Sequence, residues 1–333
     1  MKSEGFNIVS GRYIRSVLSD EMAQVKEVVR QAYVAHSKGE SVLPQSVFLR
    51  FGIHGTSRII ALPACIPDAG LIGIKWIASV ADNVTKGIPR ASAVIVLNDA
   101  ITGRPRACLE GAAISAYRTA ASAVLCLEQI TTGRNVGTVG VVGAGVIADT
   151  VLRYLVHEKW GIDHIAVHDL VPERAAEMVR RTSVLFPDTQ VESVEQLGNV
   201  VTRSDVLVLA TTASTPYLTN TGWFSHCPAI LHLSLRDLDP DVLRIGQNIV
   251  DDPMHVTRER TSLHLAATEC PDHNLIAGTV ADLLEGRTSR NPDVPVIVSP
   301  FGLGILDLAV ASFVYGRAVA HGAVTVITDF FEE

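Results

Sequence analysis

Apolar residues follow two different patterns along this chain of 333 residues. Between residues 58 and 109 the apolar runs are short and are joined by turns such as 67–70. This pattern predicts a meander of strands at 58–65, 71–80, 91–97 and 104–109. Apolar residues at helical spacing predict helices at 19–37 and at 111–130, before and after the meander.

Beyond residue 135 strands alternate with helices or long connections. Val139, Val141 and Val142 form the β-branched run expected of a parallel strand that is covered on both faces. Further strands are expected at 165–169, 205–210, 229–235, 248–251 and 294–299, with helices at 146–156, 172–185 and 304–321. This alternation predicts an α/β fold with a Rossmann-type, doubly wound parallel sheet.

A glycine-rich turn, Gly143-Ala-Gly-Val-Ile-Ala148, separates a predicted strand from a predicted helix. In a dinucleotide-binding unit Gly143 allows the tight turn, Gly145 lets the backbone approach a pyrophosphate, and Ala148 packs the helix on the strand. Glycine-rich turns also occur in plain loops, but here strand, turn and helix fall in register. The expected cofactor contacts, with the phosphates at the helix N-terminus, are Gly143, Ala144, Gly145, Val146 and Ile147.

Asp169 ends the next predicted strand, twenty-one positions beyond Ala148. A carboxylate at this place accepts hydrogen bonds from the adenosine ribose hydroxyls of a dinucleotide. No arginine follows it directly, and Arg174 lies five positions on, inside a predicted helix. The segment therefore favours NAD over NADP. Small polar residues that follow two later strands suit the same cofactor, namely Thr211, Thr212 and Ser234.

The two patterns together predict two domains. Residues 1–120 and 305–333 would form a discontinuous α+β substrate-binding domain, and residues 121–304 would form an NAD-binding Rossmann domain inserted into it. A chain of this length is long enough for two separate cores. A hydride acceptor in the insert would meet its substrate in the cleft between the domains.

Composition narrows the range of partners. Hydrophobic residues make up 47% of the chain and charged residues 19%, which is typical of a compact globular protein. The net charge of −7 disfavours nucleic acid and anionic membranes. The five cysteines are scattered, no apolar leader follows Met1, and charges interrupt the apolar stretch 305–327, so we expect a cytoplasmic protein without a membrane span. His164 and His168 are four apart on a predicted strand rather than a helix, so no metal site is expected.

Two cations interrupt apolar segments. Lys75, in Gly73-Ile-Lys-Trp-Ile77, is either a surface residue with its head in water or a cleft residue that binds a carboxylate or acts as a base. Arg118 is an isolated charge on a helix of small and apolar residues, so a ligand carboxylate or an internal acid must meet it. The pattern alone leaves both alternatives open for each residue.

Weaker candidates lie at three other places. Arg50 would be a third cation that faces the same space. Arg236 and Asp237 follow a predicted Rossmann strand at its carboxyl edge, and they are either catalytic or a structural ion pair. Asp307 opens the last predicted helix, where the helix dipole alone favours a carboxylate.

Six segments together resemble the ornithine cyclodeaminase/μ-crystallin family over nearly the whole chain. They are Gly73-Ile-Lys75, residues 83–89, residues 99–105, Tyr117-Arg-Thr-Ala-Ala121, Gly140-Val-Val-Gly-Ala-Gly145 and residues 299–307. The resemblance implies a homodimer with a Rossmann domain and a substrate domain that also dimerises. It also implies that Lys75, Arg118 and Arg50 bind an α-amino acid substrate.

One segment departs from the cyclodeaminase pattern. Ornithine cyclodeaminases carry an Asn-x-x-Gly-Gly-Asp type segment where this chain has His232-Leu-Ser-Leu-Arg-Asp237, without the two glycines. The family's catalytic Asp maps onto Asp237. The Ser-Leu-Arg-Asp form resembles a branch of NAD-dependent dehydrogenases of siderophore and diaminopropionate biosynthesis. These enzymes convert N-(2-amino-2-carboxyethyl)-L-glutamate to 2,3-diaminopropionate and 2-oxoglutarate.

The implied reaction fits what the residues can do. A hydride leaves the glutamate α-carbon, and water then hydrolyses the resulting imine. The conjugate carries three carboxylates, for which the matching cations would be Arg50, Lys75, Arg118 and Arg236. Lys75 or Asp237 would take the proton or activate the water.

Three alternatives stay open. A cyclodeaminase would convert ornithine to proline and ammonia without net NADH formation. An imine reductase or alanine-dehydrogenase-like enzyme would run toward the amino acid. A binding protein of the crystallin type would keep the cofactor site without turnover, but several partly buried cations in a cleft argue against it.

Overall fold

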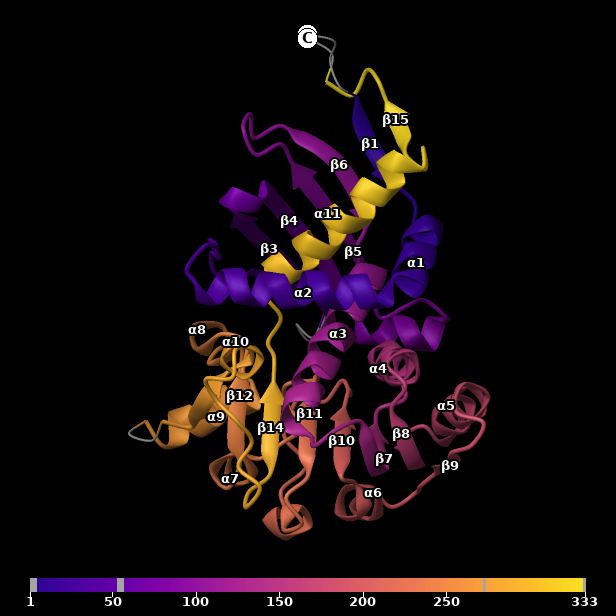
Figure 1. Ribbon diagram of the computed structural model, residues 1–333, viewed down its shortest axis with the longest axis vertical. Coiled ribbons are helices and arrows are strands. Elements are labelled where there is room, and N and C mark those ends of the chain that lie inside the picture. The colour runs from indigo at the N-terminus through magenta and orange to yellow at the C-terminus, as the bar shows by residue number, and fades with distance from the viewer. Residues whose placement is uncertain (1–4, 53–56, 272–273, 332–333) are drawn as a thin grey trace. The chain divides into compact units, whose positions relative to one another are not determined.

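The computed structural model describes residues 5–52, 57–271 and 274–331. By its internal contacts the chain divides into two compact units. Unit 1 comprises residues 1–118 and 302–333, and unit 2 comprises residues 119–301. Among the described residues, unit 1 carries a seven-stranded mixed sheet and unit 2 carries an eight-stranded parallel sheet (Figure 1).

The sheet of unit 1 has the strand order β15-β1-β6-β5-β4-β3-β2. Its neighbouring strands are antiparallel, except that β1 and β6 are parallel. Helix α11 lies across one face of this sheet, and α2 crosses and packs against α11 (Figure 1). The elements are β1 (Phe6–Val9), α1 (Gly11–Asp20), α2 (Met22–Ser37), β2 (Val47–Phe51), β3 (Ser57–Ile66), β4 (Leu71–Ser79), β5 (Ala91–Asn98), β6 (Pro105–Glu110), α11 (Gly304–Ala320) and β15 (Thr325–Ile327), with short 3-10 turns at Pro67–Ala69 and Ala81–Lys86.

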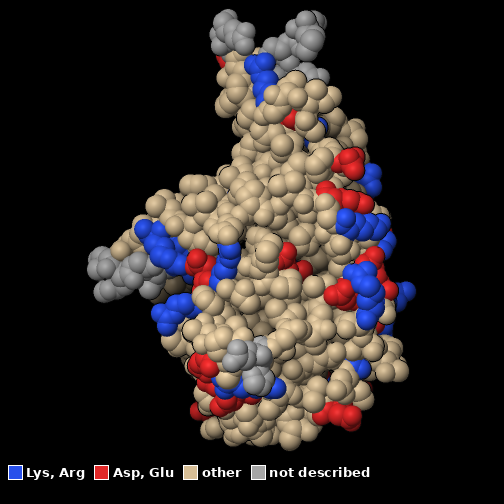
Figure 2. Space-filling view, turned by 90° about the vertical axis from the view of Figure 1, so that its left-hand side faces the viewer, with Lys and Arg blue, Asp and Glu red and all other residues tan. Residues whose placement is uncertain are grey.

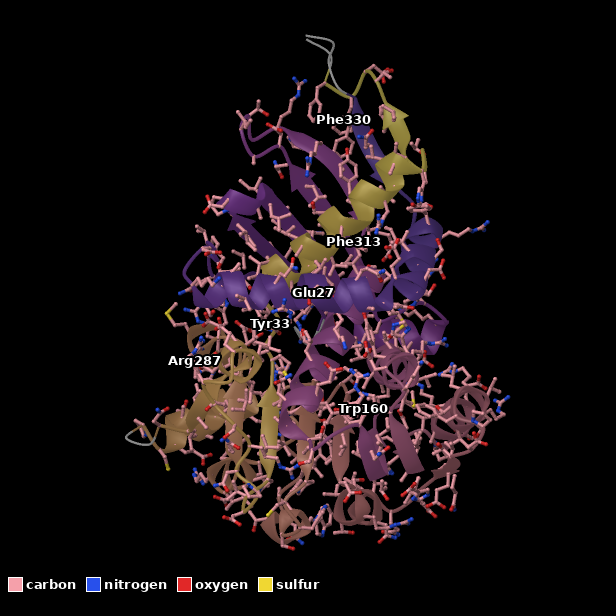
Figure 3. The ribbon with its side chains drawn as sticks, in the orientation of Figure 1. Glu27, Tyr33, Trp160, Arg287, Phe313 and Phe330 are labelled. Carbon is pink, nitrogen blue, oxygen red and sulfur yellow. The ribbon has the colours of Figure 1, made fainter. Side chains whose placement is uncertain are left out.

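The predicted meander is confirmed by strands β3 to β6. The predicted helix 19–37 is wrong at its start, because two helices, α1 and α2, meet at Glu21, whose backbone is not helical. Strands β1 and β15 were not predicted. They pair at the edge of the sheet, and the ring of Phe330, just beyond β15, stacks on that of Phe6 with 4.4 Å between centroids (Figure 3).

The sheet of unit 2 has the strand order β13-β12-β14-β11-β10-β7-β8-β9, and all its pairs are parallel. Strand β7 lies between β8 and β10, where the order reverses, and doubly wound sheets bind ligands at such a point. The elements are β7 (Asn135–Val142), α4 (Val146–His157), β8 (Gly161–His168), α5 (Pro172–Leu185), β9 (Gln190–Ser193), α6 (Leu197–Arg203), β10 (Val206–Leu209), a 3-10 turn (Thr221–Phe224), β11 (Ala229–His232), α7 (Pro240–Arg244), β12 (Gln247–Val250), α8 (Pro253–Val256), α9 (Ser262–Glu269), β13 (Ile276–Thr279), α10 (Val280–Leu284) and β14 (Val296–Ser299). Helix α3 (Ala112–Ile130) begins in unit 1 and continues in unit 2.

Every residue of β10, β11 and β14 is buried, as expected for strands covered on both faces. The predicted strand 229–235 is too long. Strand β11 ends at His232, and Leu235 has a left-handed backbone with a φ of 72°, which a strand cannot contain. Among the described residues, none of the helices has the length and apolar character that a membrane crossing requires.

Candidate functional site

A buried cluster of charges lies between the sheet of unit 1 and α11. Lys75 on β4 is only 3% exposed, and Asp307 on α11 is fully buried. The Nζ of Lys75 lies 2.5 Å from Oδ2 of Asp307, and the Nε of Arg118 donates to Oδ1 at 3.1 Å. The interpretation of Lys75 as a surface residue is therefore wrong. The internal acid that meets Arg118 is Asp307.

The local fold places each member of this cluster. Strand β4 points Lys75 to the face that α11 covers, where its cross-strand partners Leu62 and Ile95 are both buried. The chain enters α11 through Gly302, whose φ is 100°, and a Cβ at this position would lie 2.8 Å from a guanidinium nitrogen of Arg118. Glycine therefore satisfies both the backbone angle and the close approach at this position.

Burial and charge set the protonation of the cluster. Burial lowers the pKa of Lys75 to about 8, although Asp307 acts in the opposite direction. Burial alone would raise the pKa of Asp307, but Arg118 and Lys75 outweigh it and hold that pKa below its ordinary value. With Lys75 protonated, the three side chains carry two positive charges and one negative charge. The cluster therefore suits one further anion, and it contains an amine that can accept a proton near pH 8.

Arg50 and Arg236 have other surroundings. Arg50 lies exposed on the outer strand β2, with its guanidinium carbon 5.6 Å from the centre of the Phe48 ring. Arg236, in unit 2, donates from Nη2 to the carbonyl of Glu259 at 2.6 Å and from Nε to that of Arg260 at 3.2 Å. Both carbonyls belong to residues with positive φ, so Arg236 secures a loop of unusual backbone conformation.

Asp237 is the centre of a second buried network, in unit 2. Its carboxylate is fully buried and accepts hydrogen bonds from the hydroxyls of Thr211, Ser234 and Tyr217. Nε2 of His232 lies 3.3 Å from Oδ2 of Asp237. Burial would raise the pKa of Asp237, but the hydrogen bonds and His232 lower it to about 2. Burial raises the pKa of Tyr217, and the neighbouring Asp237 carboxylate raises it further.

This network joins two loops at the carboxyl edge of the sheet. Thr211 follows β10, Ser234 and Asp237 follow β11, and the Oγ1 of Thr211 also accepts from the backbone N–H of Ala213 at 3.1 Å. The hydroxyls of Thr211 and Ser234, predicted to contact the cofactor, thus bind Asp237 inside the protein. Thr212, in the same loop, is exposed.

The glycine-rich turn has the backbone that a dinucleotide site requires. Gly143 has a φ of 95°, and a Cβ there would lie 2.6 Å from the carbonyl oxygen of Ala210. Gly145 is exposed, and a Cβ there would meet only that same oxygen, at 4.0 Å. The chain's own packing therefore requires glycine at 143 but leaves space beside 145, which fits the close approach of a pyrophosphate. Ala144 and Ile147 are half-buried, and Val146, the first residue of α4, is 64% exposed.

Asp169 closes the nucleotide turn. Its Oδ2 accepts from the backbone N–H of Ala144 at 2.8 Å, and its Oδ1 accepts from that of Val171 at 2.9 Å. A carboxylate has about four lone-pair positions, so two stay available for ribose hydroxyls. The residues of this turn therefore fit a bound dinucleotide.

Comparison with known proteins places this chain among amino-acid oxidoreductases. The model of the ornithine cyclodeaminase/mu-crystallin family matches residues 15–322, and the chain belongs to this family. It is 28% identical to the N-((2S)-2-amino-2-carboxyethyl)-L-glutamate dehydrogenase of Staphylococcus aureus. The alignment spans 303 residues and covers 88% of this chain and 89% of that protein. It is 26% identical to the alanine dehydrogenase of Archaeoglobus fulgidus, over 97% of this chain and 98% of that protein.

A solved structure supports the same placement. The Δ1-pyrroline-2-carboxylate reductase of Thermococcus litoralis, in complex with NADH and L-proline, superposes with a TM-score of 0.88 at 26% identity, over 97% of this chain and 100% of that one. The predicted family and the Rossmann-type α/β fold are confirmed. These relatives also confirm the predictions of an NAD cofactor and of a dehydrogenase that acts on an amino-acid C–N bond.

Sequence reasoning missed the role of Asp307 in the site. The helix dipole offered a sufficient reason for a carboxylate at the start of α11, so nothing pointed to a contact with Lys75, 232 positions away. One signal was available. Arg118 required an acid or a ligand, and Asp307 was the one acid in the apolar stretch 305–327.

Proposed function

We propose that this protein oxidises N-(2-amino-2-carboxyethyl)-L-glutamate with NAD and releases 2,3-diaminopropionate and 2-oxoglutarate. The observation that carries the proposal is the buried cluster of Lys75, Arg118 and Asp307, in which two cations share one carboxylate and the lysine has a low pKa. The Ser-Leu-Arg-Asp segment before β12 and the resemblance to the Staphylococcus dehydrogenase support this substrate over other amino acids.

The glycine-rich turn at 143–147 would hold the pyrophosphate, and Asp169 would hold the adenosine ribose. NAD held there would supply the acceptor for the hydride of the α-carbon of the glutamate part. The residues of the chain then have to orient the substrate and move its proton.

Arg118 binds the substrate α-carboxylate, since its guanidinium is already oriented by Asp307. Lys75 takes the proton of the secondary amine, so that the nitrogen forms a double bond to the α-carbon as the hydride leaves. Lys75 then returns this proton to the imine nitrogen, and water adds to the carbon. One proton of the water moves to the nitrogen as the C–N bond breaks, and the other goes to solvent. The products are a primary amine and an oxo acid, so that one water is consumed and one hydride and one proton are released overall.

We assign proton transfer to Lys75 rather than to Asp237. The Asp237 carboxylate is fully buried and accepts from three hydroxyls, and its pKa of about 2 makes it a poor proton acceptor near neutral pH. Asp237 acts instead by positioning the loops that follow β10 and β11.

A second candidate is the reduction of a cyclic imino acid. The superposition on the Thermococcus reductase over nearly the whole chain favours it. Arg118 and Lys75 would bind the single carboxylate of that substrate in the same way. The direction of the reaction and the size of the substrate separate the two candidates.

The test is the absorbance of NADH with purified protein and a panel of substrates. NADH should form with NAD and the conjugate, but not with ornithine or alanine, and NADH should not be consumed with Δ1-pyrroline-2-carboxylate. Lys75→Met should abolish NADH formation while NAD affinity stays unchanged. Lys38→Met, at an exposed lysine of unit 1, is the matched control. Turnover of the cyclic imine, or full activity of Lys75→Met, would contradict the proposal.

A further inference from the structure

A groove in unit 1 does not include any member of the buried cluster. Helix α2 crosses α11 (Figure 1), and these two helices line the groove together with the turn between β3 and β4. Its volume is about 450 Å³, which is within the range of sites for small organic ligands. The residues that line it all belong to unit 1, so the groove is formed within one unit.

Small side chains leave the space that the groove occupies. Ala32 of α2 and Ala309 of α11 line it and are buried, and so is Ile66 at the end of β3. Leu71 of β4 and Phe313 of α11 are half-buried beside them. The inner part of the groove therefore suits the apolar part of a ligand, since burying apolar surface against these residues is favourable.

The polar groups of the groove are acceptors of hydrogen bonds. Glu40 and Asp68 are exposed, and among the described residues neither carboxylate has an ion-pair partner. Gln31 donates from Nε2 to Oε1 of Glu27 at 2.8 Å, so its amide oxygen stays available to accept. Within residues 5–52, 57–271 and 274–331, no lysine, arginine or histidine lines the groove. A complementary ligand therefore has to supply positive charge and N–H donors.

We propose that this groove binds a small organic cation, with an ammonium group attached to an apolar body. The apolar body lies against Ala32, Ile66 and Ala309, and the ammonium binds the carboxylates of Glu40 and Asp68 at the exposed rim. The inference goes beyond the proposed function, because the same two carboxylates would repel a substrate that carries several carboxylates. The site is therefore separate from that of the reaction and takes a ligand of opposite charge.

The test measures the affinity for a defined amine and for its neutral counterpart. The full chain, saturated with NADH, is titrated with 2-phenylethylamine and with 2-phenylethanol, in which a hydroxyl replaces the ammonium, and saturation-transfer NMR reports binding. The amine should bind about tenfold or more tightly, as expected for charged hydrogen bonds. The double variant Glu40→Gln, Asp68→Asn should lose this preference and bind the alcohol as before. Asp188→Asn, at an exposed acid of unit 2, should keep the preference.

A second variant tests the location. Ala35, a half-buried residue of α2, lines the groove, so Ala35→Leu should fill part of it and weaken both ligands at an unchanged melting temperature. Equal affinity of the wild-type chain for the two ligands would overturn the proposal. An unchanged preference in the double variant, or unchanged binding of both ligands in Ala35→Leu, would also overturn it. These measurements need no turnover, so they decide the groove whether or not the conjugate is oxidised.

Discussion

At the scale of single residues, Lys75 connects the structure to the pH dependence of the reaction. A lysine ordinarily titrates near 10.5, but burial lowers the pKa of Lys75 to about 8. Only the neutral amine accepts a proton, so kcat/KM should rise as the pH increases through about 8 and then level off.

Asp307→Asn tests whether Lys75 sets this pH dependence. Burial and Arg118 lower the pKa of Lys75, and the carboxylate of Asp307 raises it. In this variant the inflection of kcat/KM should move to lower pH. The full pH profile of both proteins is the measurement. A profile of unchanged shape, with only a lower rate, would make Asp307 a purely structural residue.

Asp237 should contribute to stability rather than to proton transfer. Its pKa falls from an ordinary 3.8 to about 2, so its contribution is present above the ordinary value and is lost as the pH falls through about 2. Asp237→Asn should therefore lower the free energy of unfolding at pH 7 by about 2 kcal/mol. Urea unfolding measures the change, with Asp163→Asn at an exposed site as control. A variant that is as stable as the wild type but inactive would instead indicate that Asp237 takes part in the reaction.

At the scale of elements, the two glycines of the turn between β7 and α4 have different roles. Gly143 is required by the fold, and Gly145 would be required by the cofactor. Gly145→Ala should leave the melting temperature unchanged and weaken NADH binding, because the nearest atom to its Cβ lies 4.0 Å away. Gly143→Ala should instead destabilise the protein by about 1–3 kcal/mol, since its backbone is left-handed and its Cβ would meet the carbonyl of Ala210. Fluorescence titration with NADH and thermal unfolding distinguish the two effects. Unchanged NADH affinity in Gly145→Ala would place the pyrophosphate elsewhere.

Long elements with a clear period could be predicted from the sequence. Helix α5 has the predicted bounds, 172–185, because Pro172 starts it and its apolar residues keep helical spacing. The short β9, β13 and α7 to α10 were missed, since four to eight residues give too little periodicity. Lys75 and Arg118 were recognisable because each interrupts an apolar segment. The contact of Lys75 with Asp307 was not, because it joins residues 232 positions apart and no local pattern of the sequence states it.

At the scale of the whole molecule, the face of the unit 1 sheet opposite α11 exposes large apolar side chains to solvent. Val47, Ala61, Trp76 and Val94 are cross-strand partners in one row, and Val47, Trp76 and Val94 are between 41% and 65% exposed. Figure 2 shows an area of the upper part of the molecule with few charged side chains. Exposed apolar faces of this kind are common at interfaces, so the homodimer expected from the sequence would associate through this face.

Trp76→Glu should convert the expected dimer to a monomer in light scattering, because it puts a charge in the middle of this row. Val184→Glu, at an 81% exposed valine of α5 in unit 2, should leave the dimer intact. A monomeric wild-type protein, or a dimer that survives Trp76→Glu, would exclude this face as the interface.

The carboxylate that completes the amino-acid cluster lies 232 positions after its lysine, on the last long helix. During translation, residues 119–301 are synthesised as one uninterrupted stretch before that helix. Unit 2 can therefore fold before unit 1 is complete, because residues 1–118 require residues 302–333 to form their unit. A chain truncated after residue 301 should therefore still bind NADH but lack the carboxylate that completes the amino-acid cluster.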